Sequence, residues 1–384
     1  MKSDDWSIWQ GNMAAQCLAQ PEDALAIIDL TGETRRDVTY GDLAERADGL
    51  ARALLAEVRP GDRVGVLLSQ SPWCAAAHLA IWKVGAISVP LFKLFKHDAL
   101  ASRINDAGCA IVLTDAEGAD LLGDLATPWI ASEVGIAGAP VAFAEVGPED
   151  PAVLIYTSGT TGTPKGALHA HRVLSGHLPG VSVSHDHLGQ KGDCLWTPAD
   201  WAWIGGLFDV AMPALALGVP VVAARMPKFT VEGCADVMAR GEVRNVFFPP
   251  TALRMLKASD VSLSGLRSVA SGGEPLGAEM LAWGRKAFGL EINEFYGQTE
   301  CNMVASSCGV DFPAQPGCIG KPVPGFDLAV LNADGQPTDA EGDVAVRKGA
   351  PSMMLRYWNR PEETAAKFHG DWLLTGDRGI WEGD

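Results

Sequence analysis

Positive charge is scarce in this sequence. Lys and Arg number 30 against 47 Asp and Glu, which gives the 384-residue chain a net charge of −17. A surplus of acid this large argues against a nucleic-acid backbone or an anionic membrane surface as the main partner, although it still permits a local basic pocket for a small anion. Charged residues make up 20% and hydrophobic residues 47% of the chain, which excludes wholesale disorder.

Closely spaced cysteine pairs are also missing. None of the 8 cysteines belongs to a C-x-x-C pair, which argues against a zinc ribbon and a thioredoxin-like motif. Scattered thiols of this kind are typical of a cytoplasmic protein whose cysteines are reduced and mostly buried. They stand at positions 17, 74, 109, 194, 234, 301, 308 and 318.

Long hydrophobic runs are absent too. The segment 66–82 is uncharged, but polar residues and Pro72 interrupt it. It is therefore predicted to be a strand followed by a buried helix and not a membrane span. Residues 1–13 contain two acids and no apolar core, so we expect no signal peptide.

Short β-branched runs alternate with longer helical runs through most of the chain. Residues 63–68 predict a strand and 71–85 a helix, and this succession predicts parallel sheets with helices on both faces. The runs are too many for one sheet. After residue 310 a strand–turn–strand pattern around 334–335 predicts antiparallel pairing. We expect an α/β fold with two parallel-sheet α/β subdomains, 1–150 and 151–310, and a small antiparallel β subdomain, 311–384.

The strongest functional signal is the segment YTSGTTGTPKG at 156–166. Its glycines let backbone N–H groups turn toward an anion, its hydroxyls add donors, and Lys165 adds a positive charge. We predict that it binds nucleotide phosphates at a strand–helix junction, with a polar surface turn as the alternative. A Walker A loop is excluded, because Pro164 stands where that pattern requires glycine. The candidate residues are Thr157, Ser158, Gly159, Thr160, Thr161, Gly162, Thr163 and Lys165.

Four further segments occur in an order that matches one family. They are KVGAISVPL (83–91), SGGEPL (271–276), EFYGQTE (294–300) and LLTGDRG (373–379). Together with the 156–166 segment they resemble the motifs of the adenylate-forming superfamily, which includes acyl-CoA synthetases, adenylation domains of peptide synthetases and luciferases. The resemblance implies the large-domain fold of these enzymes. It also implies a reaction in which a carboxylic acid and ATP form an acyl-adenylate and pyrophosphate, after which a thiol, usually coenzyme A, displaces AMP.

The resemblance gives the motif residues their expected roles. Lys165 and the preceding loop would hold the β- and γ-phosphates, Thr299 would hydrogen-bond the α-phosphate, and Glu300 would bind Mg²⁺. A carboxylate combined with phosphate oxygens is the usual environment of Mg²⁺ in such sites. Without the motif, Glu300 would be interpreted as a solvated surface acid.

On the nucleoside side, Tyr296 would stack on adenine and Asp377 would accept hydrogen bonds from the ribose hydroxyls. Glu294 stands where relatives carry Asp or Asn near the adenine amino group, and a solvent-facing strand position is the alternative. The other candidate nucleotide-binding residues are Gly272, Gly273, Glu274, Pro275, Gly297 and Gln298.

The segment ADWAWIGG at 199–206 resembles the aromatic motif of the family. It implies that the acyl group lies near Trp201, Trp203, Gly205 and Gly206, with core packing as the alternative for the tryptophans. Acetyl-CoA synthetases read W-W-Q-T-E where this chain reads YGQTE at 296–300. Gly297 in place of the second tryptophan implies a larger pocket. The expected acid therefore shifts from acetate toward medium-chain or aryl acids.

Five histidines fall within one short stretch of the chain. Neither a cysteine pair nor an H-E-x-x-H spacing accompanies them, so we do not expect a transition-metal site there. His169, just past the phosphate segment, is expected to pack near the nucleotide. The five are His169, His171, His177, His185 and His187.

Full-length members of the family carry a smaller C-terminal lid domain after the T-G-D motif, and we expect this lid to be absent here. The lid would supply a late lysine and half of the coenzyme A site, so ATP should bind while adenylation is slow and no acyl-CoA forms. Two other functions stay open. One is a non-catalytic ATP- or AMP-binding module, and the other is an adenylation domain that loads a carrier protein. No nucleic-acid partner is expected.

Overall fold

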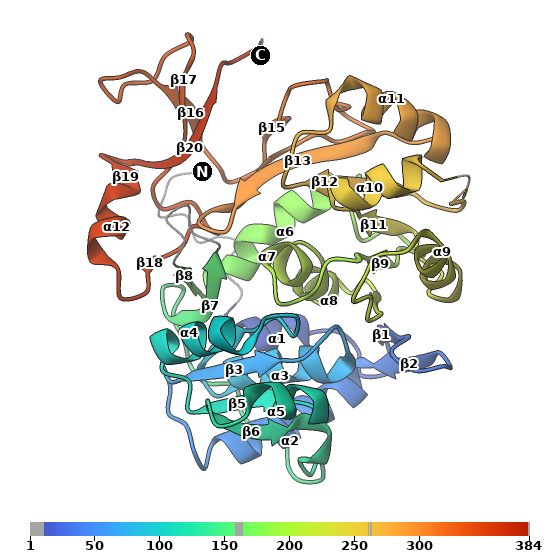
Figure 1. Ribbon diagram of the computed structural model, residues 1–384, viewed down its shortest axis with the longest axis vertical. Coiled ribbons are helices and arrows are strands. Elements are labelled where there is room, and N and C mark those ends of the chain that lie inside the picture. Colours follow the sequence, from blue (N-terminus) through green and yellow to red (C-terminus); the bar gives the residue numbers. More distant parts are fainter. Residues whose placement is uncertain (1–10, 158–163, 260, 262, 383–384) are drawn as a thin grey trace.

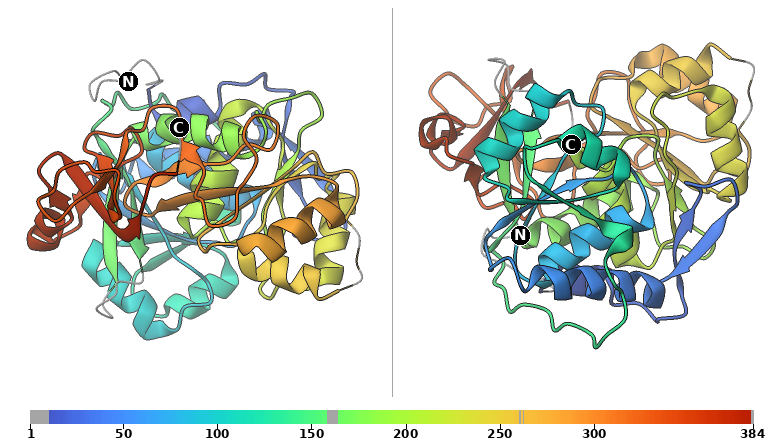
Figure 2. Two further views of the ribbon diagram at one scale, coloured as in Figure 1. Left: turned by 90° about the horizontal axis from the view of Figure 1, so that it is seen from above. Right: turned by 60° about the horizontal axis from the view of Figure 1, so that its bottom comes forward.

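The structure is a computed structural model that describes residues 11–157, 164–259, 261 and 263–382. These residues form three β-sheets with helices packed between and around them (Figure 1). The blue and cyan part of the chain lies below the green to orange part, and the red C-terminal part lies beside the latter (Figures 1 and 2). This is the expected α/β fold.

The first sheet has the strand order β18-β8-β7-β4-β3-β5-β6. Pairing is parallel from β7 to β6 and antiparallel between β7, β8 and β18. Its central strands are short runs of buried apolar residues, as a sheet covered on both faces requires. The strands are β3 (Arg63–Leu67), β4 (Ile87–Pro90), β5 (Ile111–Thr114), β6 (Thr127–Ile130), β7 (Pro151–Thr157), β8 (Lys165–Ala170) and β18 (Arg356–Tyr357).

The second sheet has the order β15-β14-β13-β12-β11-β9-β10-β1-β2. It is parallel from β13 to β1 and has antiparallel strands at both edges. The strands are β1 (Leu25–Asp29), β2 (Arg36–Thr39), β9 (Leu195–Trp196), β10 (Val221–Ala223), β11 (Asn245–Phe247), β12 (Ser268–Gly272), β13 (Ile292–Gln298), β14 (Asn302–Ser306) and β15 (Lys321–Pro322).

The third sheet is antiparallel, in the order β16-β17-β20-β19. Its first two strands flank the expected turn at Asp334 and Gly335, where Gly335 has a φ of 74°. That left-handed conformation explains the glycine. The strands are β16 (Leu328–Leu331), β17 (Gly342–Arg347), β19 (Phe368–His369) and β20 (Trp372–Gly379).

Sheet membership crosses the expected segment limits. β1 and β2 precede residue 150 but lie at the edge of the second sheet, whereas β7 and β8 follow it and complete the first sheet. Likewise β18, beyond residue 310, pairs with β8. The division into subdomains 1–150, 151–310 and 311–384 stays a prediction. Each of the two large sheets takes strands from more than one of these segments.

The helices cover the sheets and begin at ordinary capping residues. Thr39 and Asp42 form a capping box at the start of α2, and Ser71 caps α3, whose first residue is a proline. The helices are α1 (Met13–Cys17), α2 (Tyr40–Leu54), α3 (Pro72–Lys83), α4 (His97–Ala107), α5 (Ala116–Leu122), the 3₁₀ turn η1 (Ala131–Glu133), α6 (Arg172–Ser184), α7 (Ile204–Gly206), the π-helical turn η2 (Leu207–Ala211), α8 (Met212–Leu217), α9 (Val231–Arg240), α10 (Pro250–Lys257), α11 (Gly277–Phe288) and α12 (Pro361–Ala366).

Helix α3 joins the two large sheets. Its side chains belong to one hydrophobic core that contains Val64 of β3 and both Leu195 and Val221 of the second sheet. Lys83 at its end forms a buried ion pair with Asp48 at 2.5 Å. The two α/β layers therefore share a core and do not pack as separate units.

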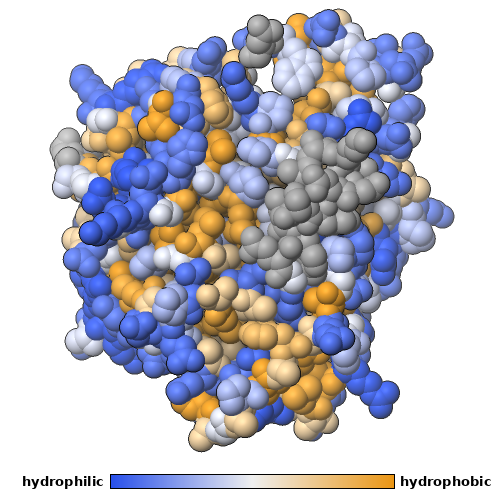
Figure 3. Space-filling model, turned by 180° about the vertical axis from the view of Figure 1, so that it is seen from behind, coloured by the Kyte–Doolittle hydropathy of each residue, from blue (hydrophilic) through white to orange (hydrophobic). Residues whose placement is uncertain are grey.

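The surface agrees with the composition. Within the described residues, no helix combines the length and the apolar character that crossing a membrane requires. The back face is largely hydrophilic, with hydrophobic residues gathered at its centre and lower edge (Figure 3). All eight cysteines are described and free, and all but Cys318 are buried, so the expectation that they are mostly buried is confirmed.

Candidate active site

The described ends of the phosphate segment lie on two paired antiparallel strands. Lys165 begins β8 and pairs with Thr157 at the end of β7, so the segment between them joins two antiparallel neighbours. The expected helix directly after the segment is therefore wrong: residues 165–170 form a strand, and α6 begins only at Arg172. The physical reason is the pairing of β8 with both β7 and β18. The candidates outside the described residues are Ser158, Gly159, Thr160, Thr161, Gly162 and Thr163.

Tyr357 connects the two charged motif residues. Its hydroxyl donates to Oε1 of Glu300 at 2.5 Å, and the Nζ of Lys165 lies 5.4 Å from the centre of its ring. Burial raises the pKa of Tyr357, and the hydrogen bond to Glu300 acts in the same direction. Glu300 and Thr299 stand in the turn between β13 and β14. The structure thus brings a cation, a phenol and a carboxylate together from three distant segments.

A second group connects β13 with β20. The hydroxyl of Tyr296 donates to Oδ2 of Asp377 at 2.5 Å. Gln298 donates from Nε2 to the carbonyl of Thr375 at 2.7 Å and accepts from Nζ of Lys367 at 3.0 Å. Burial raises the pKa of Tyr296, with the Asp377 hydrogen bond adding to it. The predicted stacking and ribose-binding residues are therefore neighbours.

The segment 271–276 lies beside Glu294. Gly272 ends β12, and a Cβ at this position would collide with the ring of Phe295, so the packing requires glycine. The carboxylate of Glu294 accepts from the N–H of Leu276 at 3.4 Å, and its Oε2 has no hydrogen-bond partner among the described residues. Burial raises the pKa of Glu294.

The remaining members of this segment differ in their surroundings. Gly273 has a φ of 99°, and Glu274 is exposed and pairs with Arg254 at 3.0 Å. Pro275 follows in the same turn. The segment therefore presents its backbone, while Glu294 supplies a buried carboxyl with a free acceptor position. The solvent-facing alternative for Glu294 is wrong, since 7% of this residue is exposed.

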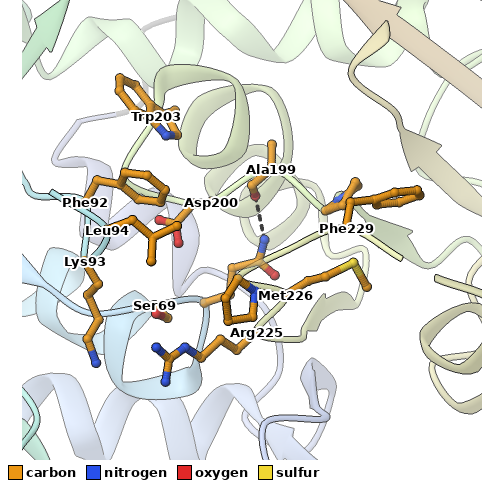
Figure 4. A pocket seen from close by; sticks show the side chains of 13 residues that line it. Ser69, Phe92, Lys93, Leu94, Ala199, Asp200, Trp203, Arg225, Met226 and Phe229 are labelled. Atoms are coloured by element: carbon orange, nitrogen blue, oxygen red, sulfur yellow. Dashed lines mark hydrogen bonds between the residues drawn. The ribbon is translucent and has the colours of Figure 1, made fainter. Parts of the chain in front are cut away.

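The candidate acyl residues do not surround one cavity in the described structure. Trp203 faces a cavity of about 270 Å³, with its ring 5.5 Å from that of Phe92 (Figure 4). Trp201 is fully buried in the core between the sheets, as its alternative interpretation has it. A Cβ at Gly205 would lie 3.1 Å from Phe247. At the other two glycines a Cβ would collide with main chain, of Asp200 at Gly206 and of Asn302 at Gly297.

The direction of Gly297 bears on the expected pocket size. Because its missing side chain points at the backbone of β14, a tryptophan there would displace the strand and not simply fill a pocket. The glycine is thus required by close packing. The direction of its Cβ gives no support to a role in opening the acyl pocket.

Charged residues line one side of the Trp203 cavity. Lys93 is almost fully buried and bonds Asp115 and Glu117, each at 2.8 Å, and Arg225 also pairs with Glu117 (Figure 4 draws Lys93 and Arg225). These bonds lower the pKa of Glu117 to about 2. Burial raises the pKa of Asp200, on the opposite side, to about 6. Both cations are therefore paired with carboxylates of the protein.

The five histidines do not form one cluster. His169 and His171 are buried on and after β8, and His185 is buried beside Ser268. Nδ1 of His177 lies 3.2 Å from the buried carboxylate of Asp209. His187 is half exposed and bonds Asp311. The five histidines therefore do not converge on one point, and the expectation of no transition-metal site in this stretch stays a prediction.

The family follows from a comparison with known proteins. The family model described as AMP-binding enzyme matches residues 13–358. The chain belongs to the AMP-binding enzyme family. Among curated relatives of this AMP-binding enzyme, an acetyl-coenzyme A synthetase of Bacillus subtilis is 29% identical over 381 residues, which cover 90% of this chain and 65% of the relative. A subunit of the linear gramicidin synthase of Brevibacillus parabrevis is 31% identical over 341 residues, which cover 87% of this chain and 4% of the relative.

Solved structures agree with the fold. The ATP-bound crystal structure of MatB from Rhodopseudomonas palustris matches with a TM-score of 0.85 and 26% identity, over 97% of this chain and 76% of that one. The N-terminal domain of FACL13 from Mycobacterium tuberculosis matches with a TM-score of 0.83 and 23% identity, over 97% of both chains, which shows the fold alone. The AMP-binding enzyme thus spans 65% of the length of the Bacillus subtilis relative and 97% of the N-terminal domain of FACL13.

Sequence reasoning identified both ends of the Lys165–Glu300 group and missed its centre. Tyr357 and its strand β18 lie outside all the motif segments of the sequence. The only sequence signal is position: the RYW triplet at 356–358 ends two residues before the helix that starts at Pro361. The pairing of β18 with β8 brings it to the site.

Proposed function

We propose that this AMP-binding enzyme is an ATP-dependent acyl-CoA synthetase, an AMP-forming acid–thiol ligase. The observation that supports the proposal is that Tyr357 contacts both Glu300 and Lys165, the lysine of the glycine-rich segment. One phenol therefore contacts both a cation and a carboxylate. This pair suits a triphosphate with its metal ion, because the lysine compensates phosphate charge and the carboxylate binds the metal ion.

Glu300 fits a magnesium ion by its chemistry. Its carboxylate supplies hard oxygen, and its contact in the structure is a neutral phenol and not a lysine or arginine that would compete with a cation. Bound there, Mg²⁺ supplies positive charge to the phosphate oxygens. Lys165 neutralises the phosphates that leave as pyrophosphate, and Thr299 donates to the α-phosphate.

The nucleoside is held between the Tyr296–Asp377 pair and the segment 271–276 with its neighbour Glu294. Tyr296 stacks on adenine, Asp377 accepts from the ribose hydroxyls, and the buried Glu294 accepts from the adenine amino group. A carboxylate oxygen of the acid attacks the α-phosphorus, and the bond to pyrophosphate breaks. The thiol sulfur of coenzyme A then attacks the acyl carbon, AMP leaves, and the thiol proton passes to solvent.

The finer proposal concerns the acid. We infer that it is a medium-chain or aryl acid, and the support is the cavity beside Trp203, whose aromatic wall includes Phe92. A cavity of about 270 Å³ has far more room than an acetyl group needs. The cavity, and not Gly297, therefore supports a large acid.

ATP binding is tested by calorimetric titration of Lys165→Ala and Glu300→Ala in the presence of Mg²⁺, together with ATP–pyrophosphate exchange. We expect each variant to lose roughly tenfold or more in affinity or exchange rate, since each leaves phosphate charge uncompensated. The matched control is Lys257→Ala, which breaks a surface ion pair of 2.6 Å with Glu279. Wild-type affinity and exchange in both site variants would overturn the proposal.

The acid is tested by exchange with acetate, butyrate, octanoate and benzoate. We expect octanoate or benzoate to be preferred, and Trp203→Ala to change kcat/KM between acids while leaving the KM for ATP in place. Trp283→Ala, on α11, is the control. An acetate preference, or an unchanged ratio in Trp203→Ala, contradicts the assignment of this cavity.

A carrier-protein thiol is the second candidate acceptor. The 31% identity to the linear gramicidin synthase favours it, because that name belongs to a peptide synthetase. Mass spectrometry of thioester formation, with coenzyme A and a pantetheinylated carrier protein supplied in separate reactions, distinguishes the two. A chain that binds ATP and performs no exchange with any acid would be the nucleotide-binding module.

A further inference from the structure

Three potential metal ligands lie close together, with His187 and Asp311 half exposed and Cys308 buried. His187 follows α6, whereas the other two lie in the turn after β14. Their nitrogen, sulfur and carboxylate donor atoms all lie within 4.8 Å of one another. Nε2 of His187 is 2.8 Å from Oδ2 of Asp311, and Sγ of Cys308 is 3.8 Å from the same oxygen. Two segments far apart in sequence thus converge three potential ligands.

The donor set matches one class of cation. Imidazole nitrogen, thiolate sulfur and carboxylate oxygen together are the ligands of Zn²⁺ and related transition metals, whereas Mg²⁺ and Ca²⁺ prefer oxygen alone. Metal–ligand bonds of about 2.0–2.3 Å put tetrahedral ligand atoms roughly 3.3–3.8 Å apart. The sulfur–oxygen distance is 3.8 Å, and the His187–Asp311 distance of 2.8 Å needs only a small opening of two half-exposed side chains.

The thiol lies in negative surroundings. Sγ of Cys308 is 3.6 Å from Oδ1 of Asp186 as well as 3.8 Å from Asp311. Oδ1 of Asp186 also accepts from the N–H of Gly309 at 2.7 Å and from Asn293 at 2.9 Å, which fixes the turn that carries Cys308. Two carboxylates beside the sulfur favour a cation at this point.

The backbone that presents His187 is also unusual. Asp186 has a φ of 53° and His187 a φ of 62°, so two successive residues with side chains adopt the left-handed conformation. Such a conformation costs of order 1–3 kcal/mol for each residue and is commonly found at functional positions. Here it places one carboxylate under the Cys308 turn and the imidazole against Asp311.

We propose that His187, Cys308 and Asp311 bind Zn²⁺ or a similar soft divalent transition-metal ion, with solvent as the fourth ligand. Binding forms a metal–sulfur bond and releases the Cys308 proton to water. The ion joins the end of α6 to the turn after β14, the strand that follows the Glu300 turn, and so it ties two segments of the large domain together. This site is independent of the proposed acyl-CoA synthetase activity.

The test is calorimetric titration of metal-free protein with Zn²⁺, without nucleotide. We expect about one ion per chain in the wild type and roughly tenfold or more weaker affinity in Cys308→Ser, His187→Gln and Asp311→Asn. Co²⁺ gives a second readout, because thiolate coordination produces a charge-transfer absorption band that Cys308→Ser must lose. Circular dichroism verifies the fold of each variant, and His187→Gln, at a half-exposed position, keeps the test open if Cys308→Ser unfolds.

Two matched controls identify binding elsewhere. Cys318→Ser removes the only cysteine that is not buried, whose Sγ lies 3.4 Å from a carboxylate oxygen of Glu382. His97→Gln removes an exposed histidine beside Asp98. Both controls should bind Zn²⁺ as the wild type does. Equal affinity in the wild type and in His187→Gln and Cys308→Ser, or loss of binding in Cys318→Ser, would overturn the proposal.

Discussion

The buried histidines should make the fold sensitive to mild acid. Burial lowers the pKa of each of four histidines well below 6.5, so the folded protein keeps them neutral while the unfolded chain protonates them. Their stabilisation is therefore complete above pH 6.5 and is lost as the pH falls below it. Their pKa values are about 3 for His78, about 3 for His169, about 4 for His171 and about 3 for His185.

The magnitude follows from linkage. Between pH 7.5 and 5.5 each histidine should lower the free energy of unfolding by about 1.4 kcal/mol, or roughly 5 kcal/mol for the four. Asp200 acts in the other direction, because burial raises its pKa to about 6 and its protonation restores about 1 kcal/mol over the same range. Asp209 and Glu294 have raised pKa values for the same reason and reinforce this smaller effect. The net loss of about 4 kcal/mol is a large share of a typical domain's stability.

The assay is urea unfolding followed by tryptophan fluorescence at pH 7.5, 6.5 and 5.5. His78 packs against Trp82, and its Nδ1 has no hydrogen-bond partner among the described residues, so His78→Leu should reduce the pH dependence by the share of one proton. His97→Gln, at an exposed position, should leave the pH dependence unchanged. Equal stability at pH 7.5 and 5.5, or an unaltered slope in His78→Leu, would refute the reasoning.

Three further predictions concern single side chains. Tyr357→Phe keeps the ring beside Lys165 and removes the hydroxyl that donates to Glu300, so ATP–pyrophosphate exchange should fall roughly tenfold or more; an unchanged rate at subsaturating Mg²⁺ would contradict a positioning role. Asp200→Asn should raise the Tm above pH 6, where the wild type buries a charged carboxylate, and should have little effect below pH 4. Lys83→Met leaves Asp48 buried without its partner and should cost about 3–5 kcal/mol in urea unfolding, most of which the additional change Asp48→Leu should restore; an undamaged single variant would count against the buried pair.

Much of the fold could be predicted because the strands are short apolar runs bounded by turn residues. The runs at 63–67 and 111–114 and the Asp-Gly turn at 334–335 carry that signal locally. The strand after the phosphate segment could not be predicted in this way. Its sequence, KGALHA, has no β-branched residue, and its conformation is decided by pairing with β7 and β18 on either side. The placement of β1 and β2 at the edge of the second sheet is likewise decided by tertiary contacts, since β1 pairs with β10.

The candidate site also contains residues that local sequence predicts and residues that only tertiary contacts bring there. Motif residues such as Lys165 and Glu300 could be identified as candidates, because each belongs to a motif that is contiguous in the sequence. Tyr357 could not, since only sheet pairing brings it between them. The two tryptophans of ADWAWIGG stand two residues apart, yet Trp201 enters the core and Trp203 a cavity. No periodicity distinguishes these positions in a turn, and Gly297 faces a backbone that lies next to it only in the folded hairpin.

The crossing of strands between the sheets has a consequence for synthesis on the ribosome. β1 emerges early but pairs with β10, about 190 residues later, and at about 5–20 residues per second it waits roughly 10–40 seconds for that partner. The first sheet waits about as long, because β8 pairs with β18, which follows it by about 190 residues and includes Tyr357. During this interval both nascent sheets present unpaired edges. Chaperones that bind extended chain should therefore engage this protein as it is made, and premature termination anywhere before residue 357 should leave a product that aggregates.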